Sequence, residues 1–178
     1  MKPDPAPALK ICLLGEYGVG KSSLANRWVF DQFSEVYKST IGVRTLASTA
    51  VWRDGRRQRC VVWDVVGEPA LSELTRRYMV GADISLFVAD GLRSRTLNTA
   101  LALAAEAGKA FPTGMKRALV LTKLDQRSLW QITQSDIDHA GNQGMPLALT
   151  SSRDALGFDS LVDILGFSIE AADETRQA

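Results

Sequence analysis

One short segment near the start of the chain restricts the fold more than any other feature of the sequence. Residues 15–22 read GEYGVGKS, which is the pattern G-x-x-x-x-G-K-S. An apolar run at 11–14 precedes it and a helical pattern at 21–30 follows it, so the loop joins a strand to a helix. A glycine-rich turn in that place directs backbone N–H groups inward, and the helix N-terminus adds positive charge. The segment therefore predicts a polyphosphate-binding loop in an α/β domain.

The residue types of this loop each suit the binding of phosphate. The glycines let the backbone wrap closely, the Lys21 ammonium would reach the β- and γ-phosphates, and the Ser22 hydroxyl would ligate Mg²⁺. The residues predicted to contact the phosphates are Gly15, Gly18, Val19, Gly20, Lys21, Ser22 and Ser23. A glycine-rich turn with an exposed lysine is the alternative, and the same loop serves ATPases, kinases and GTPases alike.

Apolar runs alternate with helical patterns along the rest of the chain. The predicted strand and helix pairs are 11–14 with 21–30, 59–63 with 71–80, 84–89 with 96–110, 118–121 with 135–142, and 146–149 with 158–172. A further strand at 45–52 joins 59–63 through an antiparallel hairpin at Asp54-Gly55. We therefore expect an α/β three-layer sandwich of the P-loop NTPase type, with a mostly parallel six-stranded sheet and one antiparallel edge strand. Nucleotide would bind at the carboxyl ends of the strands.

Composition favours a single globular domain. The 178 residues are 46% hydrophobic and 23% charged, and the formal net charge of +1 provides no field that would attract nucleic acid. We expect a flexible proline-rich lead at 1–9, one domain at 10–172 and a short tail at 173–178. No apolar run reaches the roughly 18 residues that cross a bilayer. Position 2 is not glycine and the last residues contain no cysteine, which predicts a cytoplasmic protein without a direct lipid anchor.

A second motif, LTKLD at 121–125, concerns the base of the nucleotide. Guanine presents two adjacent donors, N1–H and the exocyclic amino group, which one carboxylate accepts together, whereas adenine offers no such pair. We expect Asp125 to make this contact while the Lys123 stem covers the ring. A backbone N–H of Ser151 or Ser152 would reach the guanine oxygen. Alone, T-K-x-D is more often a surface charge cluster, but at a strand end after a phosphate loop it favours guanine.

Two segments between these motifs suit the terminal phosphate and its metal. The D-x-x-G pattern at 64–67 places a carboxylate near the water shell of the metal and the Gly67 N–H near the γ-phosphate. Thr40 would close the metal from the opposite side, so the expected metal ligands are Ser22, Thr40 and Asp64. The contacts of Thr40 and Gly67 exist only with the terminal phosphate bound, so hydrolysis would release two loops at once. A plain turn at 64–67 is the alternative.

Taken together, the motifs resemble the Ras superfamily of small GTPases, nearest to its Rab and Rho branches, over about 10–172. Residues 40–43 (TIGV) resemble the Rab switch I, 63–67 resemble the start of the Rab switch II, and TKLD is similar to the Rho-type base motif. Residues 150–153 (TSSR) match the family's T-S-A-K with two changes. The base-contacting residues that this resemblance implies are Phe33, Thr122, Lys123, Asp125, Ser151, Ser152 and Arg153.

The resemblance further implies a switch that binds GTP and GDP with Mg²⁺ and hydrolyses GTP. Its expected partners are effectors, an exchange factor and an activating protein, which would bind through Tyr37–Val43 and Gly67–Tyr78. Nucleic acid is not among them. The residues expected to serve hydrolysis are Lys21, Thr40, Gly67 and Glu68.

Four departures from the family pattern favour an atypical member with slow hydrolysis, one that a bacterium could encode. Tyr17 stands where the family has a small residue, and its bulk would exclude an arginine finger. Glu68 replaces the glutamine that orients the attacking water. Arg44 and Thr45 follow Ile-Gly-Val where Rab proteins carry Asp-Phe, and the C-terminal cysteine is missing.

Two other functional classes stay open at this point. A pseudo-GTPase would act as a nucleotide-bound scaffold without useful turnover. A P-loop nucleotide kinase would need an arginine-rich lid that the sequence lacks, and it would leave Thr40 and Asp125 without a role. Cys12 and Cys60 are expected to be small core residues. The hairpin arginines, which are either a solvated edge or a site for an acidic partner, are Arg53, Arg56, Arg57 and Arg59.

Overall fold

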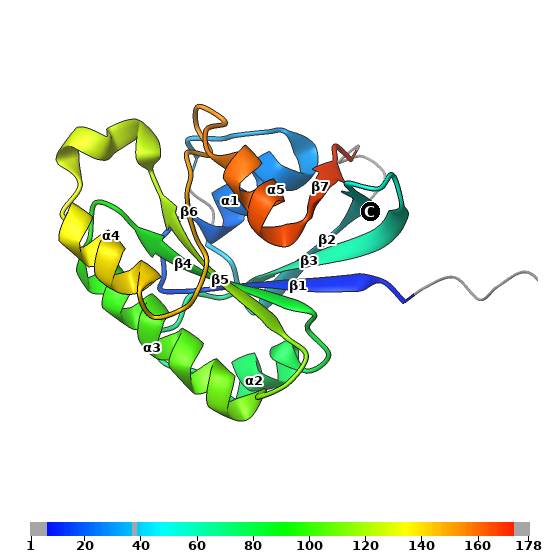
Figure 1. Ribbon diagram of the computed structural model, residues 1–178, viewed down its shortest axis with the longest axis horizontal. Coiled ribbons are helices and arrows are strands. Elements are labelled where there is room, and N and C mark those ends of the chain that lie inside the picture. The colour runs from blue at the N-terminus through cyan, green and yellow to red at the C-terminus, as the bar shows by residue number, and fades with distance from the viewer. Residues whose placement is uncertain (1–6, 37–38, 173–178) are drawn as a thin grey trace, which may run out of the picture.

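The computed structural model describes residues 7–36 and 39–172 (Figure 1). Most of the expected proline-rich lead, the Tyr37 end of the expected partner surface and the tail at 173–178 lie outside the described residues. Leu9, which the sequence interpretation placed in the lead, is already the first residue of a strand.

A seven-stranded sheet, in the order β6-β5-β4-β1-β3-β2-β7, forms the middle of the described structure. The strands are β1 (Leu9–Leu14), β2 (Val43–Trp52), β3 (Arg57–Val65), β4 (Ile84–Asp90), β5 (Lys116–Thr122), β6 (Leu147–Leu149) and β7 (Phe167–Glu170). Neighbours from β6 to β3 run parallel, whereas β2 runs antiparallel to both β3 and β7. The α/β class, the mostly parallel sheet and the antiparallel hairpin are thus confirmed, although the edge strand beside the hairpin is β7 and not β2.

Helices cover both faces of this sheet and make the expected three layers (Figure 1). They are α1 (Lys21–Phe30), α2 (Glu73–Met79), α3 (Arg95–Ala110), α4 (Gln134–Gly141) and α5 (Phe158–Leu165), with a 3₁₀ turn, η1, at Leu124–Leu129. Residues of α1 and α5 pack into one core and residues of α2, α3 and α4 into the other. Strand β4 lies between the two cores, and all of its residues are buried, as is typical of a strand covered on both faces.

The helix predicted over 158–172 is wrong in its second half. It ends at Leu165, because Gly166 adopts a φ of 87° and its N–H bonds to the carbonyl of Val162. A glycine in the left-handed conformation is a common way to end a helix, since other residues pay a steric cost there.

Strand β7 takes the place of the missing helical turns. It pairs with β2 over Thr49–Trp52, so the sheet has seven strands instead of the predicted six and β2 is covered along that stretch. Phe167 explains the change, because its ring is fully buried, with centroids 5.0 Å from Trp52 and 6.4 Å from Trp28. This aromatic cluster fixes the strand to the sheet.

Within the described residues, no helix is long and apolar enough to cross a membrane.

Candidate functional site

A cavity of about 1020 Å³ opens where β3 and β5 end and α1 begins. Most residues predicted to bind nucleotide line it, namely Gly18, Gly20, Lys21, Ser22, Ser23, Phe33, Thr40, Gly67, Thr122, Lys123, Asp125, Ser152 and Arg153. The predicted residues that are not part of the lining are Gly15, Val19, Asp64, Glu68 and Ser151. One cavity therefore joins the phosphate loop to the base motif.

Lys21 is buried at the bottom of the phosphate loop. The loop starts at Gly15, where a Cβ would lie 2.3 Å from the carbonyl oxygen of Val88, so only glycine fits. Lys21 Nζ donates to the carbonyls of Gly15 (3.0 Å) and Glu16 (2.9 Å). Burial lowers the pKa of Lys21 to about 8, and the charge of Asp64 opposes this shift. An anionic ligand would stabilise the charged form of this ammonium.

The three predicted metal ligands lie together. The hydroxyls of Ser22 and Thr40 are 2.9 Å apart, and Thr40 Oγ1 donates to Asp64 Oδ2 (3.4 Å). Burial raises the pKa of Asp64, while hydrogen bonding from Ser22 and the charge of Lys21 oppose the shift. Asp64 Oδ1 is buried and has no hydrogen-bond partner among the described residues. Two hydroxyls and a carboxylate are the oxygen ligands that Mg²⁺ prefers, so this set fits the metal.

Gly67 and Glu68 meet the phosphate loop from the β3 side. A Cβ on Gly67 would lie 2.4 Å from both Cα and N of Tyr17, so only glycine permits this approach. The Glu68 N–H donates to the Gly15 carbonyl (3.2 Å). The Glu68 carboxylate is outside the cavity lining, because its Oε2 accepts a hydrogen bond from Thr75 Oγ1 (2.8 Å) in α2. The predicted catalytic carboxylate is thus held by α2.

The segment leading to β2 contacts both the phosphate loop and α1. Ser39 Oγ donates to the hydroxyl of Tyr17 (3.4 Å), a ring that is 53% exposed at the mouth of the cavity. Arg44, at the position of one of the family departures, donates to Asn26 Oδ1 in α1 (2.8 Å). The substituted residues therefore make contacts that tie this segment to the body of the domain.

At the base end of the cavity, the TKLD motif is fixed by short hydrogen bonds. Thr122 Oγ1 donates to the carbonyl of Val19 (2.6 Å), which links this motif to the phosphate loop. Ser151 Oγ donates to Asp125 Oδ1 (2.7 Å). Lys123 adopts a positive φ of 64° and lines the cavity, as its predicted role over the base requires.

The outer wall of the base end is made from α1 and the segment after β6. Arg27 donates to the carbonyls of Ser152 (2.7 Å) and Arg153 (3.2 Å). Arg153 forms an ion pair with Glu35, across the wall that also contains Phe33. The two side chains of this pair are 51% and 73% exposed.

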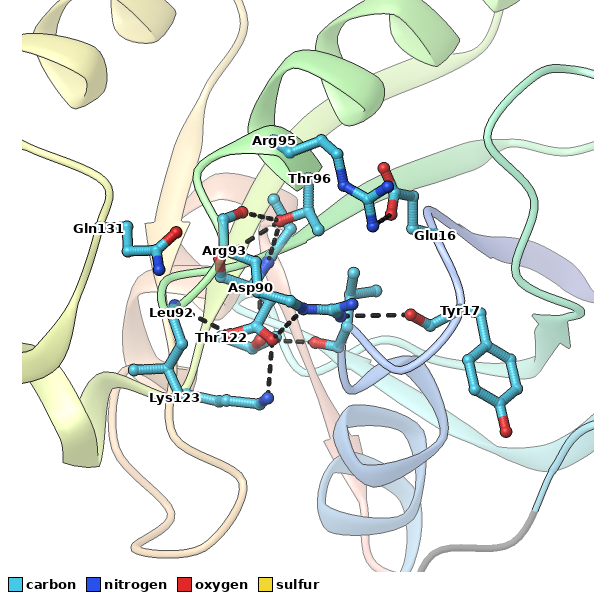
Figure 2. A network of polar contacts seen from close by, with 12 residues as sticks. Glu16, Tyr17, Asp90, Leu92, Arg93, Arg95, Thr96, Thr122, Lys123 and Gln131 are labelled. Atoms are coloured by element: carbon cyan, nitrogen blue, oxygen red, sulfur yellow. Dashed lines mark hydrogen bonds and ion pairs between the residues drawn. The ribbon is translucent and has the colours of Figure 1, made fainter.

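The sequence interpretation missed several residues that hold the site, namely Arg27, Thr75, Asp90 and Arg93. Asp90 had a readable signal, because it is the one charged residue of a strand that is otherwise apolar or small. The other three act through tertiary contacts, which the spacing of residues in the sequence does not reveal. Figure 2 shows Asp90 and Arg93 between the phosphate loop and Lys123.

The hairpin arginines are a solvated edge. Their ion pairs are those of Arg53 with Asp163, Arg56 with Asp54, and Arg57 with Glu170. Partners from the same chain thus neutralise three of the four charges, and the fourth arginine, Arg59, is exposed to solvent.

The two cysteines are core residues, as expected. Burial raises the pKa of Cys12 to about 12 and that of Cys60 to about 11, so both thiols are neutral at physiological pH. No group of three or more His, Cys, Asp and Glu that could hold a metal occurs in the described part of the chain.

Comparisons with known proteins agree with this geometry. The model of the Ras family matches residues 10–169. Ras-related protein Rab-22A of Canis lupus familiaris is 28% identical over 166 residues, which are 93% of this chain and 85% of that protein. GTP-binding protein ypt5 of Schizosaccharomyces pombe is 28% identical over 171 residues, 95% of this chain and 81% of that protein. Ras-related protein Rab-7L1 of Rattus norvegicus is 28% identical over 137 residues, which are 72% of this chain and 65% of that protein.

Proposed function

The chain belongs to the Ras family of GTP-binding GTPases, and from this premise we propose that it is a Mg²⁺-dependent guanine-nucleotide switch with slow turnover. The observation that carries the proposal is that Ser22 and Thr40, which line one end of the cavity, meet Asp64 behind it, while Asp125 lines the other end. A metal-binding set next to a phosphate loop, in one cavity with a carboxylate suited to guanine, is what a guanine nucleotide requires.

The residues at the two ends of the cavity divide the work of binding. Asp125 accepts hydrogen bonds from the two guanine donors, and Ser151 holds one of its oxygens in place. Lys21 and the inward N–H groups of the loop bind the phosphates. Ser22, Thr40 and Asp64 would hold the metal, which neutralises phosphate charge when bound.

Hydrolysis is an attack of water oxygen on the γ-phosphorus, in which the bond to the bridging oxygen breaks and GDP leaves with the electron pair. Slow turnover is supported by the Thr75 contact, because it engages the Glu68 carboxylate with α2 and away from an attacking water. Tyr17 supports it as well, because its side chain stands at the mouth of the cavity, where an arginine finger would enter.

Protein partners would bind beside the cavity, on the segments that respond to the terminal phosphate. Ile41 is 93% exposed and Leu74 is 47% exposed, so each offers an apolar side chain to a partner. Both lie within the surfaces at 37–43 and 67–78, of which residues 37–38 are outside the described structure. Effectors, an exchange factor and an activating protein in the cytoplasm are the partners we propose.

Calorimetry with GDP, a non-hydrolysable GTP analogue and ATP tests this function. The parent should bind both guanine nucleotides and prefer them strongly to ATP. Asp125→Asn places an amide donor opposite a guanine donor, so it should weaken the binding of GDP by about 1–3 kcal/mol or more. Asp138→Asn, which changes an exposed carboxylate of α4, is the matched control and should leave GDP binding unchanged. Equal affinity of the parent for ATP and GTP would overturn the assignment of the base.

A further inference from the structure

A buried carboxylate lies behind the phosphate loop and joins it to the base motif. The Asp90 side chain is 1% exposed, and its Oδ2 accepts from Lys123 Nζ (2.7 Å) and from Arg93 Nε (2.8 Å). Its Oδ1 accepts from the Leu92 N–H (3.0 Å), which fixes the carboxylate in the turn before α3. With one oxygen shared by two cations, Asp90 holds Arg93 in a defined orientation.

Arg93 uses a second nitrogen of its guanidinium to contact the phosphate loop. Its Nη2 donates to the carbonyl oxygen of Tyr17 (3.2 Å), as the dashed lines in Figure 2 show. The same nitrogen is 3.6 Å from where a Cβ of Gly18 would be. The guanidinium therefore spans from the buried carboxylate to the backbone of the loop.

This contact controls where the next N–H of the loop points. In a trans peptide the carbonyl of one residue and the N–H of the next point in opposite directions. A donor that holds the Tyr17 carbonyl outward, toward α3, therefore turns the Gly18 N–H to the other side of the loop, and Gly18 lines the cavity. Thr122 acts in the same way two peptides further on, since its hydroxyl holds the Val19 carbonyl (2.6 Å).

We propose that Arg93 is a positioning residue of the phosphate site, which aims the Gly18 N–H at the polyphosphate by holding the Tyr17 carbonyl from behind. The role rests on the proposed nucleotide function of the cavity. An arginine suits it better than a lysine, because the planar fork bonds two acceptors in fixed directions, whereas an ammonium is a single point.

The setting of the pair distinguishes it from an ordinary surface salt bridge. Exposed pairs contribute little, but Asp90 is buried and Arg93 is only 36% exposed. Arg93 also repels Lys21 electrostatically. A polyphosphate bound on the loop relieves that repulsion, so the positive charge of Arg93 favours an anionic ligand there.

The test is the ratio of the GMP to the GDP dissociation constant, measured by competition against a fluorescent GDP analogue with Mg²⁺ present. GMP lacks the β-phosphate but keeps the base, so the ratio reports on phosphate contacts alone. Arg93→Gln should lower this ratio about tenfold, the effect of one charge-assisted hydrogen bond. Arg93→Lys, which keeps the charge and the fold, should recover only part of the loss.

Arg53→Gln is the matched control, since it removes the same charge from a hairpin side chain that is 63% exposed, pairs with Asp163 and is not part of the cavity lining. It should change the ratio less than twofold. An unchanged ratio in both Arg93 variants, or an equal fall with Arg53→Gln, would overturn the positioning role. A parent protein that binds neither nucleotide would instead overturn the proposed function, and the role of Arg93 with it.

Discussion

The two ends of the nucleotide cavity are held together in different ways. At the phosphate end the fixing groups are buried: Lys21 is 6% exposed, and the Asp90 side chain is 1% exposed. At the base end the outer wall depends on the exposed pair of Arg153 and Glu35. Removing one partner of a buried charge pair costs several kcal/mol of stability, whereas removing one partner of an exposed pair costs little. We therefore expect the buried groups that fix the phosphate end to be more sensitive to substitution than the outer wall of the base end.

The largest effect is expected for Asp90→Ala. The change leaves Arg93 and Lys123 without their shared carboxylate and the Leu92 N–H without its acceptor. It should lower the free energy of unfolding by about 3 kcal/mol, the lower end for a broken buried pair, because both cations keep some contact with water. Urea denaturation of the variant and of Asp138→Asn measures it. A loss below about 1 kcal/mol would show that the buried ion pairs of Asp90 stabilise the fold no more than a surface pair does.

Thr40→Ala tests the metal end of the phosphate site. The variant loses the hydroxyl between Ser22 and Asp64, which we expect to contact ligand only through the terminal phosphate and its metal. Affinity for a non-hydrolysable GTP analogue should fall about tenfold, the effect of one hydrogen bond to a charged group, and GDP affinity much less. Calorimetry with both nucleotides decides. Equal losses would mean that Thr40 serves the fold alone.

A smaller effect is expected for Thr75→Val, which keeps the shape of the side chain and removes the donor to Glu68. Freed from α2, the carboxylate can enter the cavity, so single-turnover hydrolysis of GTP should rise about threefold, the effect of a weak hydrogen bond. Thr75→Ser keeps the hydroxyl and should behave like the parent.

A double-mutant cycle shows whether this effect acts through Glu68. In a Glu68→Ala background, Thr75→Val should leave the rate unchanged. The same increase in both backgrounds would place the effect of Thr75 in the packing of α2.

The smallest effect is expected at the base end. Glu35→Gln breaks the exposed pair with Arg153 and should change GDP affinity by less than about 1 kcal/mol, an effect that weakens further in salt. Titrations at low and high ionic strength measure it. A loss larger than that of Thr40→Ala for the GTP analogue would reverse the comparison of the two ends.

The features that the sequence predicted correctly are mostly those determined by residues close together in the chain. The phosphate loop, the hairpin at Asp54-Gly55 and the helix from Lys21 to Phe30 follow from residues that are neighbours in the chain. Ser22, Thr40 and Asp64 were each predicted to hold the same metal, and the structure brings the three side chains together.

The missed features depend on contacts between distant segments. Strand β7 forms because Phe167 packs against a tryptophan of β2 and another of α1. The sequence of residues 158–172 alone does not reveal those partners. The Glu68 carboxylate was predicted at the site of hydrolysis, and its hydrogen bond to Thr75 depends on how α2 packs. Arg93 likewise acquires its role only when the turn before α3 is placed against the phosphate loop.

The most direct test of the account is the identity of the nucleotide that the protein carries through purification. The protein is purified with Mg²⁺ present and then denatured, and the released small molecules are separated by ion-exchange chromatography against guanine and adenine standards. The account predicts GDP or GTP at close to one molecule per chain, and an Asp125→Asn protein that carries much less. Adenine nucleotide in the parent protein, or no nucleotide at all, would contradict it.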